Sequence, residues 1–448
     1  MKGEPIEMHL RRSLIQRDED VLWHPFSHHS LEPARMAIKR GEGTWLVTED
    51  GRHLLDAVSS WWVNLHGHSN RYIAEAIAEQ ANKLEHCIFA GFTHEPAIEL
   101  SELVLEALPP NQKKIFFSDN GSTAVEVALK MAIQADLIRT KGESKRKTII
   151  ALEGGYHGDT FGAMSVSGRG AFTAPFFDYL FDVKHLPIPT VENCSQLCHA
   201  LEAYCKDGSV LAFIYEPLVQ GAGGMNMYRA EELNTLLSIA KRYGVICIAD
   251  EVMTGFGRTG SLFASHQENV QPDFLCLAKG MTGGYLPMAA TLTTQAVYDS
   301  FLGPYDAFKS FFHGHSYTGN QLGASASLAS LELLKKPGAA GKRRALAREF
   351  KEALNGLWAS PYVGDVRHAG LVAGVELVRD WRTRATWEWK KQVGIRVCRE
   401  MARQGVLTRP IGNLIVLMPP YCCSSRQIRK MVEALSRSID IVLGKKRV

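Results

Sequence analysis

The chain has 448 residues, of which 46% are hydrophobic, 22% charged and 9% aromatic. This ordinary globular composition excludes a disordered, collagen-like or coiled-coil protein. Lys and Arg number 51 against 47 Asp and Glu, spread along the chain, which argues against nucleic acid as a partner.

The N-terminus and the cysteines indicate the compartment. No apolar run approaches the roughly 18 residues of a membrane span. Residues 1–20 carry several acidic side chains and lack the apolar core of a secretion signal. The nine cysteines are scattered and lack the paired spacing of a zinc site. We therefore expect a reduced, cytoplasmic protein without a membrane partner.

Short β-branched runs alternate with amphipathic helices along the chain. In chain order, strands are expected at residues 114–118, 148–152, 210–215, 245–249, 274–278 and 289–293. Helices are expected at residues 71–84, 96–108, 122–135, 231–243, 319–334, 344–359 and 387–404. This alternation predicts an α/β fold with a mostly parallel, buried sheet.

Two further features divide the chain. A hairpin is expected at residues 43–55, with Asp50-Gly51 as its turn, and it should join the C-terminal part. Residues 335–344 (KKPGAAGKRR) combine proline, glycine and a run of charge, which suggests a hinge. We expect an N-terminal segment (1–58) that joins the small domain, a large domain (59–335) and a small α+β C-terminal domain (336–448).

Two ionisable side chains follow buried apolar runs. Asp250 ends the run at 245–249, and Lys279 follows the run at 274–278. Ligands of open α/β sheets bind beyond the carboxyl ends of the strands, so both are site candidates if their strands are neighbours. Burial lowers the pKa of a lysine and makes its amine a nucleophile. Taken singly, Asp250 could cap a turn and Lys279 could lie on the surface.

Together, the two residues suit pyridoxal phosphate. The amine of Lys279 would bond to the cofactor aldehyde, and the carboxylate of Asp250 would keep the pyridine nitrogen protonated. The ring then accepts the electrons that are left when the substrate Cα–H bond breaks.

Two loops could hold the rest of such a cofactor. Gly121 and Ser122 stand at the start of an expected helix, where free N–H groups can bind a phosphate, although ordinary helix capping fits the same residues. Tyr156 lies between glycines and could cover a flat ring, or be an ordinary turn aromatic.

Four histidines, at positions 66, 68, 313 and 315, form two His-x-His pairs. On a strand, this spacing places two imidazoles on one face, as metal sites use. No carboxylate pattern of a hydrolase accompanies them, and we expect loop histidines and no metal.

Residues 245–290 (VICIADEVMTGFGRTGSLFASHQENVQPDFLCLAKGMTGGYLPMAA) closely resemble the cofactor-lysine signature of class III, or ω-, aminotransferases, which depend on pyridoxal phosphate. The resemblance covers nearly the whole chain, through WHPF at 23–26, SSWW at 59–62, GYHGDTFG at 155–162 and HGHSYTGN at 313–320. It implies a fold-type-I transferase and a homodimer with active sites at the interface.

The resemblance also implies roles for the cofactor site. Lys279 would hold the cofactor and move the proton, and Asp250 would hold the pyridine nitrogen. Tyr156 would stack on the ring and line the substrate pocket, while Gly121 and Ser122 would bind the phosphate.

For the substrate, the resemblance implies aromatic walls and one cation. Trp61 and Trp62 would flank a long aliphatic chain, Phe26 would also belong to the substrate site, and Arg409 would bind the substrate carboxylate. Gly314, with His315 and Ser316, would come from the partner subunit and complete the phosphate and substrate sites.

Within the family, the likeness is to members that aminate a nine-carbon oxo acid. The alternatives are members that act on ornithine, 4-aminobutyrate or a similar ω-amine, a catalytically silent relative, and a metal hydrolase. Most of the resembling members take the amino group from S-adenosylmethionine and some from lysine. Phe26 stands where many have tyrosine, and His315-Ser316 where many have Pro-Thr, and these departures favour a lysine-type donor site.

Overall fold

The computed structural model describes residues 13–29 and 36–444. Part of the expectation about the N-terminal segment rests on residues 1–12 and 30–35, which lie outside the described residues. Within the described part, no helix combines the length and apolarity that a membrane crossing requires.

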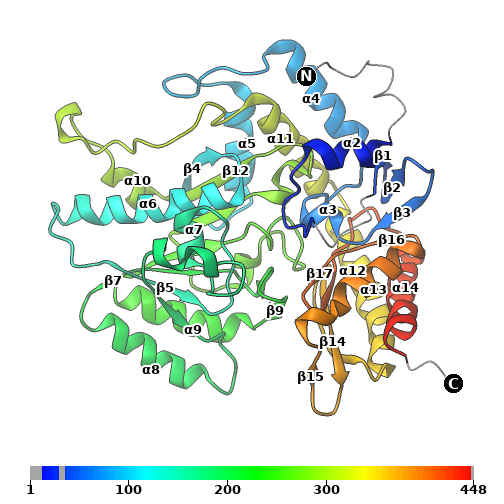
Figure 1. Cartoon of the computed structure of the whole chain (residues 1–448). Coiled ribbons are helices and arrows are strands. Elements are labelled where there is room, and N and C mark those ends of the chain that lie inside the picture. Colours follow the sequence, from blue (N-terminus) through cyan, green and yellow to red (C-terminus); the bar gives the residue numbers. More distant parts are fainter. Residues whose placement is uncertain (1–12, 30–35, 445–448) are drawn as a thin grey trace, which may run out of the picture.

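A seven-stranded sheet forms the centre of the molecule (Figure 1). Its order is β4 (Gln112–Ser118), β12 (Ala289–Thr294), β11 (Phe274–Leu277), β10 (Ile246–Asp250), β7 (Val210–Tyr215), β5 (Thr148–Leu152) and β6 (Val183–Leu186). The five strands from β11 to β6 run parallel, whereas β12 is antiparallel to both of its neighbours. The predicted α/β class and the mostly parallel sheet are therefore confirmed.

Helices cover both faces of this sheet, which is why its central strands are apolar except at their ends. One face packs against α6 (Gly121–Arg139) and α7 (Phe161–Val166). The other face packs against α8 (Cys194–Cys205), α9 (Ala230–Arg242), α5 (Glu95–Glu106) and α11 (Gln321–Lys335). Neighbouring residues of β5 point to opposite faces of the sheet. Ile149 packs on the face covered by α6 and α7, whereas Ile150 packs on the face covered by α8 and α9.

A second, antiparallel sheet is built by the C-terminal part of the chain, in orange and red in Figure 1. Its strands are β13 (Val363–Ala369), β14 (Val372–Asp380), β18 (Leu414–Leu417) and β17 (Pro410–Ile411), with β15 (Ala385–Thr386) paired to β14. Three helices share its core: α12 (Ala339–Asn355), α13 (Val393–Arg403) and α14 (Ser425–Leu443).

A third sheet joins a segment of the N-terminal part of the described chain to one strand of the C-terminal part. It contains β1 (Ile38–Glu42), β2 (Trp45–Thr48), β3 (His53–Asp56) and β16 (Val406–Leu407). The expected hairpin is confirmed, because β2 and β3 pair antiparallel and Gly51 turns between them at φ 83°. It also joins the C-terminal part as expected, since β3 pairs with β16.

Apart from short 3-10 helices, six further elements belong to the described chain. They are α2 (Leu14–Val21), α3 (Ser59–Trp62), α4 (Arg71–Lys83), α10 (Gln295–Ser300) and the short pair β8 (Val219–Gln220) and β9 (Asn226–Met227). Of these, α3 contributes directly to the site described below.

Two expected helices have starts that are clearly wrong. The helix expected at 344–359 is α12, which begins at Ala339 and so includes six of the ten residues of the expected hinge, because Gly338 at φ 82° starts it early. The helix expected at 387–404 is α13, which begins only at Val393, because Gln392 at φ 48° separates it from a short 3-10 helix. The domain boundaries stay predictions.

Candidate active site

A cavity of about 710 Å³ lies beyond the carboxyl ends of β10 and β11. Asp250 is the last residue of β10, and Lys279 follows β11 after one residue. The two strands are parallel neighbours, with Asp250 in register with Cys276. Asp250 and Lys279 both line the cavity, so the structure brings them together as the sequence led us to expect.

Lys279 has the environment of a reactive amine. Burial lowers its pKa from the ordinary lysine value, and the negative charges of Asp250 and Glu216 oppose that shift. Its Nζ lies 4.8 Å from the centre of the Trp62 ring. The backbone at Lys279 has φ 45°, a left-handed conformation that costs energy in a residue other than glycine and is often found at functional sites.

Asp250 is held in place by two hydrogen-bond donors. The Nδ1 of His157 lies 2.7 Å from Asp250 Oδ2, and the backbone N–H of Val252 donates to Oδ1 at 3.0 Å. The Nε2 of His157 is buried and has no protein partner among the described residues. No pattern in the sequence predicts this role for His157, although the residue lies in the GYHGDTFG motif.

Glu216 is a second buried residue of the site for which the sequence predicts no role. It follows β7, and its carboxylate accepts from the backbone N–H groups of Tyr156 at 3.0 Å and Gly221 at 2.8 Å. Burial raises the pKa of Glu216 to about 7, and the charge of Asp250 adds to the rise while His157 opposes it. Its position in the sequence could have indicated a site residue. Glu216 directly follows the buried strand β7, much as Asp250 is the last residue of the buried strand β10.

The start of α6 has the geometry of a phosphate site. Gly121 is the first residue of this 19-residue helix, and a Cβ added there would lie 2.6 Å from Val252 Cγ1. The Oγ of Ser122 accepts from the N–H of Thr160 at 3.0 Å. Because Gly121 and Ser122 line the cavity, the free N–H groups of the helix start are available to an anion there.

Tyr156 lines the same cavity and donates its hydroxyl hydrogen to Asp159 Oδ2 at 2.9 Å. Burial, with the charge of Asp159, raises its pKa well above the ordinary tyrosine value. Its hydroxyl therefore stays protonated at physiological pH.

A row of aromatic rings leads outward from the cavity. Trp62 is 4% exposed and lines the cavity, and Trp61 stacks on it with ring centres 5.6 Å apart. Phe26 stacks on Trp61 at 6.2 Å. Helix α3 presents the two tryptophans through a strained turn, in which Ser59 to Trp62 all have φ between 45° and 73°.

Arg409 lies at the outer end of this row. Its Cζ is 5.1 Å from the centre of the Trp61 ring, and its Nη2 donates to the carbonyl of Phe26 at 3.3 Å. Arg409, Trp61 and Phe26 lie outside the cavity lining, so the structure connects them to the site through Trp62 rather than placing them inside it.

Gly314, His315 and Ser316 also lie outside the cavity lining. The Nε2 of His315 is 4.0 Å from Asp119 Oδ1 of the same chain, and Asp119 lines the cavity. Because the structure contains one chain, the contribution of these residues to a partner's site stays a prediction.

The His-x-His pairs have polar neighbours within the chain. His66 Nε2 lies 3.0 Å from Ser330 Oγ, and His68 Nε2 lies 3.0 Å from Asp56 Oδ2. The Nδ1 of His313 lies 2.9 Å from Lys130 Nζ. Across residues 13–29 and 36–444, no group of three or more His, Cys, Asp or Glu is arranged to hold a metal ion.

The fold and the site together define a class. A mostly parallel sheet with a lysine and a carboxylate at the ends of adjacent strands is the architecture of fold-type-I pyridoxal-phosphate transferases. Residues 26–439 match the model of the aminotransferase class-III family, and the chain belongs to this family.

Similar proteins cover nearly the whole chain. The adenosylmethionine-8-amino-7-oxononanoate aminotransferase of Geobacter sulfurreducens is 41% identical over 450 residues, which span 97% of this chain and 98% of that protein. A crystal structure of the protein of the same name from Methanocaldococcus jannaschii has a TM-score of 0.93 and 39% identity, covering 96% and 99%. An ω-transaminase of Pseudomonas jessenii in complex with PMP has a TM-score of 0.90 and 27% identity, covering 96% and 98%. The protein is an aminotransferase.

Proposed function

We propose that the protein aminates 8-amino-7-oxononanoate to 7,8-diaminononanoate, a step of biotin biosynthesis, with pyridoxal phosphate as cofactor. The observation that carries this proposal is the position of Lys279 beside Asp250 at the ends of neighbouring strands. The names of the relatives described above support the substrate and support S-adenosylmethionine as the amino donor.

The cavity fits pyridoxal phosphate. The start of α6 offers N–H groups for the phosphate. Position 121 requires glycine, because any larger side chain would collide with Val252. Asp250 suits the pyridine nitrogen, and Tyr156 borders the cavity where a flat ring would lie. When bound, the cofactor supplies a ring that accepts electrons from the substrate carbon.

Lys279 carries the proton in both halves of the reaction. With its pKa lowered by burial, the amine is available in neutral form to take the proton from the donor Cα. The same Nζ would pass that proton on to the bound cofactor and, in the second half, would deliver a proton to the acceptor carbon. Asp250 would keep a proton on the pyridine nitrogen of the bound cofactor, and the hydrogen bonds from His157 and Val252 orient its carboxylate for this role.

The aromatic row suits a long aliphatic substrate. Trp62 lines the inner cavity and Trp61 with Phe26 extends the apolar surface outward. Arg409 at the outer end provides a cation for the terminal carboxylate. In the proposed homodimer, Gly314, His315 and Ser316 of each chain would complete the partner's site in the cytoplasmic enzyme.

Lysine is a second candidate for the amino donor. Phe26 stacks on Trp61 at the outer end of the row, where it offers no hydroxyl for hydrogen bonding. We expect Phe26→Tyr to raise kcat/KM for S-adenosylmethionine by about three- to tenfold, as one added hydrogen bond would.

The proposal is tested by assaying purified holoenzyme with 8-amino-7-oxononanoate and each donor in turn. We expect formation of 7,8-diaminononanoate, and loss of turnover by at least about a thousandfold in Lys279→Ala, which should still fold. The exposed Lys390→Ala is the matched control. If the enzyme instead transaminated ornithine or 4-aminobutyrate efficiently and did not aminate the nine-carbon acid, the result would favour the alternative ω-aminotransferase activity.

A further inference from the structure

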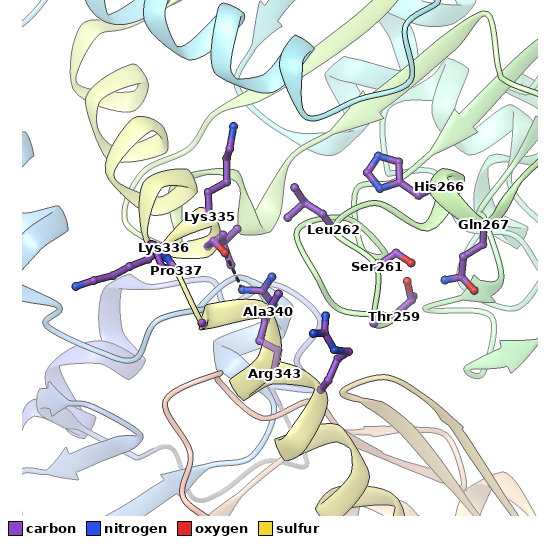
Figure 2. Close-up of a pocket in the computed structure, with 14 residues that line it drawn as sticks. Thr259, Ser261, Leu262, His266, Gln267, Lys335, Lys336, Pro337, Ala340 and Arg343 are labelled. Carbon is purple, nitrogen blue, oxygen red and sulfur yellow. Dashed lines mark hydrogen bonds between the residues drawn. The ribbon is translucent and has the colours of Figure 1, made fainter.

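The charged run at residues 335–344 has no part in the proposed reaction. It forms one wall of a second cavity, of about 890 Å³, shown in Figure 2. The opposite wall is the loop after β10, with Thr259, Ser261 and His266. This cavity and the candidate active site share no lining residue.

The lining carries positive charge and no carboxylate. Its cations are Lys335, Lys336, Arg343 and Arg344, and no Asp or Glu is among the residues that line it. Lys335 pairs with Glu106, outside the lining. Lys336 and Arg344 are exposed, and neither forms an ion pair with any residue in the part of the chain that the structure describes.

The first turn of α12 adds further positive potential. Gly338 precedes the helix without a side-chain cap, and no acidic residue lies in the first turn. The N–H groups at the start of a helix lack intrahelical partners and carry the positive end of the helix dipole. Ala340, in this turn, lines the cavity.

Two buried polar groups of the lining have no hydrogen-bond partner. Thr259 is 9% exposed, and its Oγ1 has no partner among the described residues. The Nε of Arg343 is likewise unpaired, while Nη1 of the same guanidinium donates to the carbonyl of Leu334 at 3.0 Å. A buried polar group without a partner is costly, and the oxygens of an anion would satisfy both.

We propose that this cavity binds a polyphosphate anion of the pyrophosphate class. Several cations that line one cavity without a carboxylate suit a multiply charged phosphate, because charge-assisted hydrogen bonds from guanidinium and ammonium groups are the strong ones. The α12 start and Thr259 would supply the neutral donors. A volume of about 890 Å³ accommodates more than a single phosphate.

The test is calorimetric titration of the pyridoxal-phosphate-loaded protein with inorganic pyrophosphate at fixed ionic strength. The loaded form is used so that the phosphate site at α6 is occupied. We expect one saturable site per chain. The double variant Lys336→Ala/Arg344→Ala should bind about tenfold more weakly, as expected for two exposed charge contacts.

The matched control is Arg348→Ala/Lys351→Ala. It removes two exposed charges from the same helix, at positions that do not line the cavity. It should bind within about twofold of the wild type. Thr259→Val tests the hydroxyl separately and should weaken binding about threefold or more.

Absence of saturable binding, or an equal loss in both double variants, would overturn the proposal, because the attraction would then be unspecific. Thermal midpoints check that each variant is folded. Since the readout is binding rather than transamination, the outcome does not depend on the proposed reaction being correct.

Discussion

The Nδ1 of His157 lies 2.7 Å from Oδ2 of Asp250, and both side chains are at least 96% buried. His157 belongs to the loop after β5, whereas Asp250 ends β10, and β7 lies between these strands. The carboxylate expected beneath the pyridine nitrogen is thus oriented by an imidazole that comes from two strands away.

Removing this imidazole should slow the reaction without unfolding the protein. A hydrogen bond to a charged group contributes roughly 1.5–3 kcal/mol, so we expect His157→Leu to lower kcat about ten- to hundredfold. His157→Asn keeps a donor and should recover part of the rate. The cofactor absorption band should change its pH dependence in His157→Leu, which a merely structural role would not cause.

The control is His199→Leu, an exposed histidine on α8. An unchanged kcat together with an unchanged pH titration of the absorption band in His157→Leu would remove His157 from the site.

Glu216 should make the stability of the cofactor-free protein depend on pH. Its carboxyl keeps its proton in the folded state up to about pH 7, whereas the unfolded chain releases it near 4.5. The stabilisation from this retained proton is therefore fully present below 4.5 and is lost as the pH rises to 7. The full loss is about 3 kcal/mol.

Denaturant unfolding of the wild type and Glu216→Gln at several pH values measures this effect. As the pH rises from 4.5 to above 7, the free energy of unfolding of the wild type should fall relative to that of Glu216→Gln. The exposed Glu352→Gln is the control and should show no such shift. A difference that stays constant with pH would contradict the raised pKa of Glu216.

Arg409 should affect substrate binding more than catalysis. The arginine is exposed and stacks over Trp61, and an exposed ion pair contributes up to about 1 kcal/mol. We expect Arg409→Ala to raise KM for 8-amino-7-oxononanoate about fivefold, with kcat nearly unchanged, and Arg409→Lys to recover part of it. Arg403→Ala, on the exposed side of α13, is the control. An unchanged KM would exclude Arg409 from the substrate site.

The elements that the sequence predicted well are those buried on both faces. Strands β5 and β7 match the expected residues 148–152 and 210–215, because a short continuous apolar run bounded by polar residues is typical of a buried strand. The short strand β6 at Val183–Leu186 was not expected, since its sequence (VKHL) mixes polar and apolar residues as a sheet edge allows. Residues 339–344 form a helix although glycine and charge suggested a hinge. Gly338 alone adopts the left-handed backbone conformation, at φ 82°, and the helix begins at the next residue.

The site was predictable where it depends on strand ends and less so where it depends on loops. Asp250 and Lys279 follow apolar runs that are close in sequence, and their strands are neighbours. His157 reaches Asp250 only because β5 lies two strands from β10, and the strand order is not visible in the sequence. The outward row of Trp62, Trp61 and Phe26 depends on the left-handed turn at Ser59–Trp62, which no local pattern predicts.

Borohydride reduction of the pyridoxal-phosphate-loaded protein, followed by peptide mapping by mass spectrometry, tests the central claim most directly. Reduction fixes the cofactor to whichever amine holds it. We predict a single modified peptide with the label on Lys279, and no label there when excess amino donor is added before reduction. A label on another lysine, or no label at all, would contradict the assignment of Lys279 and Asp250 as the centre of the site.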